Sequence, residues 1–124
     1  MRIVVAEDEA VIRLDLVEIL TELGHEVVAQ VGDGRAAVEA ACEHRPDLAV
    51  MDVKMPVLDG ITAAEELARE AVCPVVLLTA FSDGDLVSRA AEAGVLAYVT
   101  KPFGTQELMA RVRALLRTRS VPSD

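Results

Sequence analysis

The stretch VVAEDEA, residues 4–10, joins a short run of strand-forming apolar residues to three neighbouring acids, Glu7, Asp8 and Glu9. Neighbouring carboxylates disfavour one another's ionised form, so the cluster destabilises the chain unless a cation or a set of helix-end amides lies beside it. We therefore expect a positively charged partner at this point of the fold.

Similar apolar runs recur along the chain at regular intervals. They are rich in Val, Leu and Ala and span residues 3–6, 27–31, 48–51, 75–78 and 96–99. Because these runs are apolar on both faces, they predict strands that are buried on both sides, as in parallel sheets covered by helices.

Amphipathic stretches separate the apolar runs and predict helices. In residues 10–23 apolar side chains recur at helical spacing, and Gly24 supplies a C-terminal stop. The later helices have candidate N-caps or stops at Asp33, Asp59, Ser82, Gly94 and Thr105. Alternating strands and helices predict an α/β fold with a parallel sheet, right-handed crossovers and helices on both faces.

Chain length restricts the architecture further. At 124 residues the chain suits one domain, and an eight-stranded barrel would need roughly twice that length. An open five-stranded sheet is therefore favoured, although the residue pattern leaves the order of the strands open.

Composition and charge argue against several classes of protein. The apolar runs are far shorter than the ~20 residues that span a bilayer, and no secretory signal precedes the first strand, so we expect a soluble, cytoplasmic protein without membrane contact. The net charge of −9 argues against direct nucleic acid binding by this domain. Cys42 and Cys73 lie far apart without metal-binding spacing, which predicts two reduced thiols.

Polar residues follow each apolar run, where the ligand site of an open α/β sheet lies. In chain order they are Glu7 with Asp8, Asp33, Asp52, Thr79, and Thr100 with Lys101. Asp8 and Asp33 could instead cap the helices they precede, and Thr79 could begin a turn. Asp52 and Lys101 have no such simple structural role, so the joint pattern favours a shared binding site.

The chemistry of this set points to phosphoryl transfer. Three carboxylates repel a bare phosphate but suit a hard divalent cation, and Mg²⁺ prefers a few carboxylates together with water and a phosphoryl oxygen. One carboxylate could then act as a nucleophile, with Lys101 and Thr79 as donors to the phosphoryl oxygens.

Four motifs occur in order along the chain: AEDE, MDVKMPVLDG, LTAFS and AYVTKPF. On these motifs the chain resembles the receiver domains of bacterial two-component response regulators over residues 2–117. The resemblance implies a doubly wound (βα)₅ flavodoxin-like three-layer sandwich with parallel strand order 2-1-3-4-5. It implies a receiver domain at residues 1–118, with residues 119–124 as a polar tail or the start of a linker.

The resemblance also assigns the metal site and the acceptor. It implies that Asp52 accepts the phosphoryl group, that Glu7 and Asp8 hold Mg²⁺ with Asp52, and that the main-chain carbonyl of Lys54 is a further ligand. Two departures from common family members are Glu7, where Asp is usual, and Lys54, at a position that affects the access of hydrolytic water.

The remaining assignments lie near the last two strands. The resemblance implies that Thr79 and Lys101 bind the phosphoryl group, that Tyr98 is a switch residue, and that the bond between Lys101 and Pro102 is cis. Phosphorylation would alter the surface formed by the fourth helix, fifth strand and fifth helix, which would contact an output domain, an output partner or a second copy of the chain.

The function that follows is signalling rather than metabolism. The donor would be a phosphohistidine on a sensor histidine kinase or phosphotransfer protein, and the domain would not be an enzyme beyond its own phosphorylation and slow dephosphorylation. The wording VVAEDEAVIRLDL, VMDVKMP and LTAFS is most similar to actinobacterial regulators with an RNA-binding antiterminator (ANTAR) output. The chain would be a fragment of such a protein or a free-standing receiver.

Other classes fit the residues less well. A phosphatase of the haloacid dehalogenase type would need a second Asp two residues after a nucleophile at the first strand, but Asp8 is followed by Glu9 and Ala10. A nucleotide-binding module would need a glycine-rich loop where this loop is acidic. A receiver that has lost its chemistry is disfavoured by the complete set of Asp8, Asp52, Thr79 and Lys101.

Overall fold

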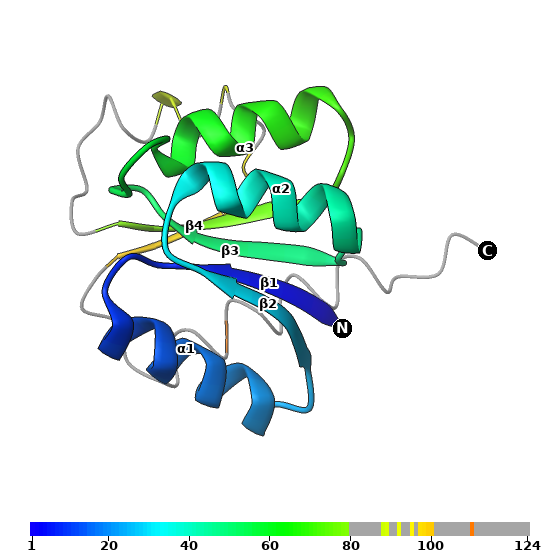
Figure 1. The fold of residues 1–124 in the computed structure, drawn as a ribbon, viewed down its shortest axis with the longest axis vertical. Coiled ribbons are helices and arrows are strands. Elements are labelled where there is room, and N and C mark those ends of the chain that lie inside the picture. The colour runs from blue at the N-terminus through cyan, green and yellow to red at the C-terminus, as the bar shows by residue number, and fades with distance from the viewer. Residues whose placement is uncertain (80–87, 90–91, 93–94, 96, 101–109, 111–124) are drawn as a thin grey trace.

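The computed structural model describes residues 1–79, 88–89, 92, 95, 97–100 and 110. Strands and helices alternate along this part of the chain (Figure 1). In order they are β1 (Arg2–Ala6), α1 (Ala10–Glu22), β2 (Glu26–Val31), α2 (Gly34–His44), β3 (Leu48–Asp52), α3 (Gly60–Arg69), β4 (Val75–Thr79) and β5 (Ala97–Thr100). Ser82, Gly94 and Thr105, together with most of the expected fourth and fifth helices, lie outside the described residues.

The strands form one parallel sheet in the order β2-β1-β3-β4-β5. This confirms the α/β class and the flavodoxin-like order that the family resemblance implies. Ala6 at the end of β1 pairs with Val31 of β2 on one side and with Met51 of β3 on the other. Because every strand runs the same way, the carboxyl ends of all five meet at one edge of the sheet.

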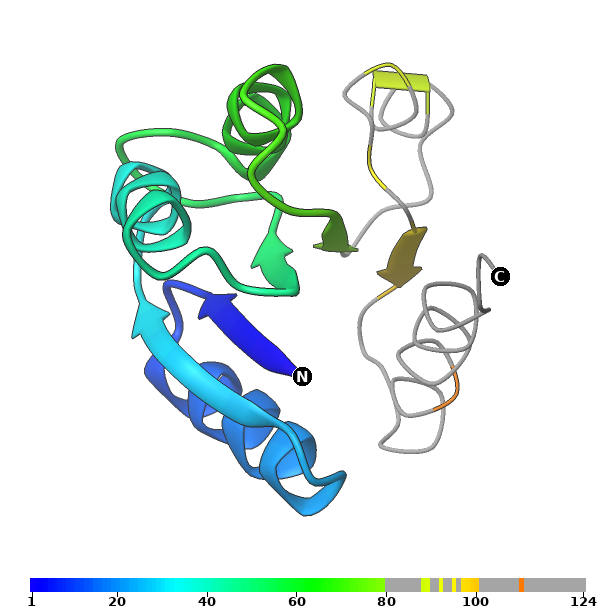
Figure 2. The same ribbon diagram turned by 90° about the vertical axis from the view of Figure 1, so that its right-hand side faces the viewer.

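Helices cover both faces of the sheet and form a three-layer sandwich. Figure 1 and Figure 2 show α2 and α3 on one side of the strands and α1 on the other. Alternate residues of β1 point to opposite layers: Val4 packs in the core under α2 and α3, whereas Ile3 packs with Leu16 and Leu20 of α1. Two apolar cores therefore hold the sheet in place from both sides.

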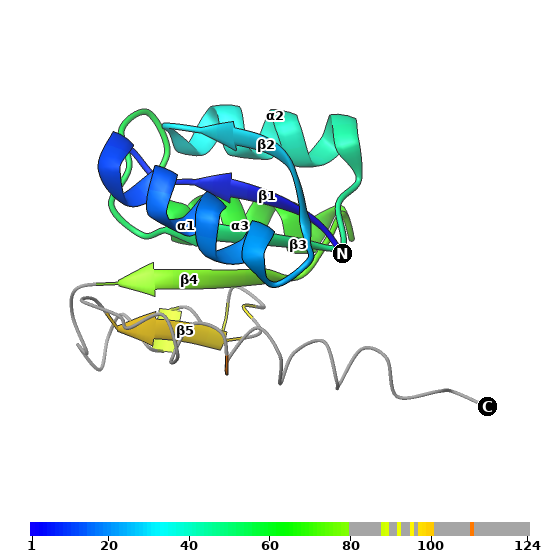
Figure 3. The ribbon, with the colours of Figure 1, turned by 90° about the horizontal axis from the view of Figure 1, so that it is seen from below.

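Strand β2 departs from the expectation of burial on both sides. Every residue of β3 is buried, but β2 is at best half-buried, with Glu26 and Gln30 exposed. The prediction of full burial is wrong for β2 because this strand lies at the edge of the sheet, beside a single neighbour (Figure 3).

The predicted helix boundaries are confirmed at three points. The side chain of Asp33 accepts a hydrogen bond from the Ala36 amide at 2.7 Å and caps α2. Asp59 caps α3 in the same way through the Thr62 amide, at 2.8 Å. Gly24, with φ of +91°, follows the end of α1 as the expected stop.

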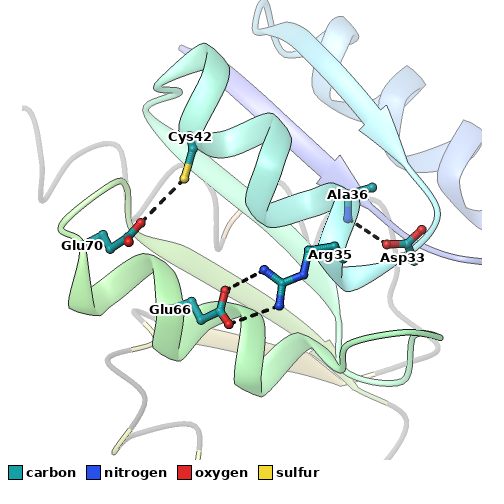
Figure 4. A network of polar contacts seen from close by, with 6 residues as sticks. All are labelled: Asp33, Arg35, Ala36, Cys42, Glu66 and Glu70. Carbon is teal, nitrogen blue, oxygen red and sulfur yellow. Dashed lines mark hydrogen bonds and ion pairs between the residues drawn. The ribbon is translucent and has the colours of Figure 1, made fainter.

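Polar contacts join α2 to α3 on the outer surface of their layer (Figure 4). The guanidinium of Arg35 donates two hydrogen bonds to the carboxylate of Glu66, at 3.2 and 3.3 Å. The thiol of Cys42 lies 3.8 Å from a carboxylate oxygen of Glu70. Cys42 is exposed and Cys73 is half-buried, and the structure records both as free cysteines. A helix with the length and apolar character needed to cross a bilayer is absent from the described residues.

Candidate functional site

Three acids come together where β1 and β3 end. Glu7 and Asp8 directly follow β1, and Asp52 is the last residue of β3. One carboxylate oxygen from each of these residues lies within 4.8 Å of the others. The strand order reverses direction between β1 and β3, so the acid cluster lies at the switch point where open α/β sheets bind ligands. We refer to Glu7, Asp8 and Asp52 as the acid cluster.

The other predicted acid of this edge has a different role. Asp33 follows β2 but turns its carboxylate back to the Ala36 amide as a helix cap. Asp8 does not cap α1, because the N-cap residue is Glu9, and within the described residues the Glu9 side chain makes no capping hydrogen bond. The sequence left a capping role open for both Asp8 and Asp33. In the structure Asp33 is a helix cap, whereas Asp8 belongs to the acid cluster.

Burial makes the acid cluster electrostatically costly. Glu7 is fully buried and Asp52 is only 6% exposed, whereas Asp8 reaches solvent. Removing carboxylates from water is unfavourable, and gathering three of them within a few ångströms adds mutual repulsion. A bound divalent cation offsets both effects, and the all-oxygen donor set fits Mg²⁺.

Glu7 is held at three atoms. Its amide donates to the carbonyl oxygen of Val31 at 3.0 Å and so extends the ladder between β1 and β2. Its carboxylate oxygen Oε1 accepts from the Glu9 amide at 3.2 Å. Its main-chain carbonyl accepts from Nη1 of Arg13 at 2.6 Å. The sequence analysis does not predict the contact between Arg13 and Glu7. A sign of it in the sequence is a positively charged residue near a helix N-terminus, where the helix dipole disfavours positive charge.

The backbone that follows Asp52 is held by two hydrogen bonds of Val53. The amide of Val53 donates to the carbonyl of Leu78 in β4 at 3.0 Å, and the amide of Gly60 donates to the carbonyl of Val53 at 2.8 Å. A Cβ atom on Gly60 would overlap the carbonyl oxygen of Asp52. The first residue of α3 therefore touches the main chain of the central acid, which only glycine permits without a shift.

An open cavity of about 630 Å³ adjoins the acid cluster. Its lining includes Asp8 from the cluster and the loop that follows Asp52, and it consists of Asp8, Val53, Lys54, Met55, Pro56, Asp59, Ile61 and Arg89. Lys54, the expected carbonyl ligand, is exposed and lies in this lining. The cavity opens beside Asp8, the exposed member of the acid cluster.

The remaining predicted residues are described in part or lie outside the description. Thr79 ends β4 and pairs with Thr100 of β5, and Tyr98 of β5 pairs with Leu77. These backbone positions place Thr79 at the same sheet edge as Asp52, which pairs with Leu78. The side chains of Thr79 and Tyr98, all of Lys101, and the bond between Lys101 and Pro102 lie outside the described residues.

Comparison with known proteins adds independent observations. The family model of the response regulator receiver domain matches residues 3–113. The transcriptional regulatory protein PdtaR of Mycobacterium tuberculosis (strain ATCC 25618 / H37Rv) is 52% identical over 121 residues, which cover 97% of this chain and 59% of PdtaR. The chemotaxis protein CheY of Bacillus subtilis is 35% identical over 93% of this chain and 97% of CheY.

A solved structure shows the same architecture. The BeF₃-activated N-terminal receiver domain of RstA from Klebsiella pneumoniae matches with a TM-score of 0.86 and 29% identity, covering 94% of this chain and 99% of that one. The first curated relatives are longer than this sequence, which spans 59% of their length.

Proposed function

This chain belongs to the response regulator receiver domain family, whose general function is phosphotransfer, and we propose that Asp52 is its phosphoryl acceptor. The observation that carries the proposal is the acid cluster, in which Asp52 lies with Glu7 and Asp8 at the switch point of the sheet. Asp8 of the cluster and Val53, the residue after Asp52, line the open cavity, from which a donor would approach.

Glu7, Asp8, Asp52 and the main-chain carbonyl of Lys54 would hold Mg²⁺. The metal, when bound, supplies positive charge that neutralises the acids and polarises the phosphoryl oxygens. The near-complete burial of Glu7 and Asp52 keeps competing water away from the inner side of the cluster, whereas exposed Asp8 faces the side from which a donor arrives.

The reaction follows from this arrangement. A carboxylate oxygen of Asp52 attacks the phosphorus of a phosphohistidine in line with the leaving group. The oxygen–phosphorus bond forms, the phosphorus–nitrogen bond breaks, and the imidazole nitrogen of the donor keeps the electron pair and takes a proton. Thr79 and Lys101 would bind phosphoryl oxygens through a hydroxyl and an ammonium group.

Partners follow from the family and stay proposals for this chain. Receiver domains generally interact with kinases or phosphotransfer proteins and with output domains, so we propose a sensor histidine kinase or phosphotransfer protein as donor. The switch would pass through Tyr98 to the surface of the fourth helix, β5 and the fifth helix, with no nucleic acid binding by this domain. The 52% identity to a mycobacterial transcriptional regulatory protein supports an output in gene regulation, and an RNA-binding antiterminator is the candidate that the motif wording favours.

Three further proposals concern the chain itself. The receiver unit occupies residues 1–118, of which the family model covers 3–113. The domain performs no catalysis beyond its own phosphorylation and dephosphorylation. Its location is the cytoplasm, where a kinase donor would meet it.

Phosphorylation with a small acyl phosphate and Mg²⁺ tests the proposal. Intact-protein mass spectrometry should show one added phosphoryl group on the wild-type chain, peptide mapping should place it on Asp52, and Asp52→Asn should abolish it. Asp33→Asn is the matched control, because Asn also caps helices and position 33 lies outside the acid cluster. Modification of another residue, or undiminished labelling of Asp52→Asn, would refute the assignment.

A further inference from the structure

Arg13, the fourth residue of α1, links three segments at the edge of the acid cluster. Its Nη1 donates to the main-chain carbonyl oxygen of Glu7 at 2.6 Å. The same nitrogen lies beside Gly32, where a Cβ atom would be 3.2 Å away. The guanidinium is therefore packed between the end of β1 and the connection that follows β2.

The carbonyl group of Glu7, which Arg13 binds, lies just after the last residue of β1 that pairs with β3. Ala6 is the last residue of β1 that pairs with β3, and the Glu7 amide extends the contact with β2 by one further hydrogen bond. Because Glu7 is fully buried, its carbonyl oxygen needs a donor from the protein. A charged donor at 2.6 Å makes a short, strong hydrogen bond there.

Peptide planarity carries the effect of this bond from Glu7 to Asp8. The carbonyl oxygen of Glu7, the amide of Asp8 and the Cα atom of Asp8 share one plane. Fixing the oxygen therefore fixes the direction in which the backbone enters Asp8, and with it the relative placement of two members of the acid cluster.

The start of α1 holds this unit from two directions. The Glu9 amide binds the carboxylate of Glu7 at 3.2 Å, and the Arg13 amide binds the carbonyl of Glu9 at 2.9 Å in the first turn. Helix α1 thus orients both the Glu7 carboxylate and the peptide bond between Glu7 and Asp8.

We propose that Arg13 is a positioning residue for the divalent cation of the acid cluster. This inference rests on the metal site of the proposed function. Arg13 has two opposing effects on the affinity for Mg²⁺. Its positive charge repels a nearby cation and lowers the affinity, whereas its hydrogen bond to the Glu7 carbonyl preorganises the ligands and raises the affinity. The sign of the change on removing Arg13 therefore separates positioning from simple charge.

The test is a Mg²⁺ titration followed by NMR amide shifts in the wild-type chain, Arg13→Met, Arg13→Gln and Arg13→Lys. The two truncations should each weaken Mg²⁺ binding by about tenfold, as is typical when a group that orients metal ligands is lost. Arg13→Lys keeps a charged donor and should recover most of the affinity. Two truncations are used so that a folded one is available if the other does not fold.

Arg69→Met is the matched control, because it removes the same charge from the last turn of α3, at the opposite end of that helix from Asp52. It should leave Mg²⁺ affinity unchanged. Unchanged or tighter binding in the folded truncations, a lysine variant as weak as the truncations, or an equal loss in Arg69→Met would overturn the proposal. Failure of the wild-type chain itself to bind Mg²⁺ would instead refute the proposed metal site.

Discussion

Gly60 begins α3 in contact with the main-chain carbonyl oxygen of Asp52, so closely that a Cβ atom at position 60 would overlap that oxygen. The Gly60 amide also donates to the carbonyl of Val53, the next residue along. The N-terminus of α3 is therefore fastened directly to the backbone that presents the central acid of the cluster.

Gly60→Ala should destabilise the fold for this reason. The added methyl group meets main chain rather than a flexible side chain, so α3 or the end of β3 has to shift. We expect the unfolding free energy to fall by about 1–3 kcal/mol, despite the better helix propensity of alanine. Urea denaturation of both proteins measures the change, and equal or greater stability of the variant would contradict the packing described.

Asp8→Asn should weaken Mg²⁺ binding without lowering the stability of the metal-free chain. Without Mg²⁺, loss of one like charge reduces repulsion in the acid cluster, so the melting temperature should stay level or rise. Mg²⁺ affinity should fall by about tenfold or more, about 1.4 kcal/mol or more, because a charged ligand is lost. Melting curves at increasing Mg²⁺ concentration measure both.

Glu9→Gln is the control for Asp8→Asn. Glu9 is the next acid along the chain and is exposed, but it lies outside the acid cluster. Its substitution should leave Mg²⁺ stabilisation unchanged. If Asp8→Asn is stabilised by Mg²⁺ as strongly as the wild-type chain, Asp8 is not a ligand.

His25 gives the fold a pH dependence near neutrality. Its Nδ1 lies 3.0 Å from the amine of Met1. Burial, and secondly the positive charge of that amine, holds the pKa of His25 below its ordinary value of 6.5. As pH falls, His25 therefore binds a proton in the unfolded chain before it does so in the folded chain. The stability that neutral His25 contributes above the pKa of the unfolded chain is lost as pH falls through the pKa of the folded chain.

His25→Asn isolates this contribution, because asparagine keeps an acceptor but does not titrate. The unfolding free energy of the wild-type chain relative to the variant should decrease as pH falls from about 7.5 to about 5. Denaturation curves at a series of pH values measure the difference, in which the other titrating groups cancel. A difference that stays constant with pH would show that folding does not shift the pKa of His25.

Much of this fold follows from local sequence patterns. The hydrophobic runs and the capping residues Asp33 and Asp59 set the strands and helices, because both depend on neighbours close in the chain. Strand order depends on which strands pair, and the residue pattern left it open; only the family resemblance supplied the order that the structure has. The half-burial of β2 follows from that order and was missed for the same reason.

The acid cluster was predictable in its members but not in its supports. Glu7, Asp8 and Asp52 each follow an apolar run, and parallel strands bring such positions to one edge. The roles of Gly60 and Arg13 depend on contacts with main-chain carbonyls of other segments. Sequence patterns record side-chain character and spacing, so contacts to another segment's backbone leave little trace in them.

The central claim is that the acid cluster is a divalent cation site serving phosphoryl transfer to Asp52. Mn²⁺ shares the preference of Mg²⁺ for oxygen ligands and can be located by anomalous diffraction. Crystals of the chain grown with Mn²⁺ should show one strong anomalous peak among the carboxylates of Glu7, Asp8 and Asp52. A metal bound elsewhere, or an acid cluster without a peak at saturating Mn²⁺, would contradict the account.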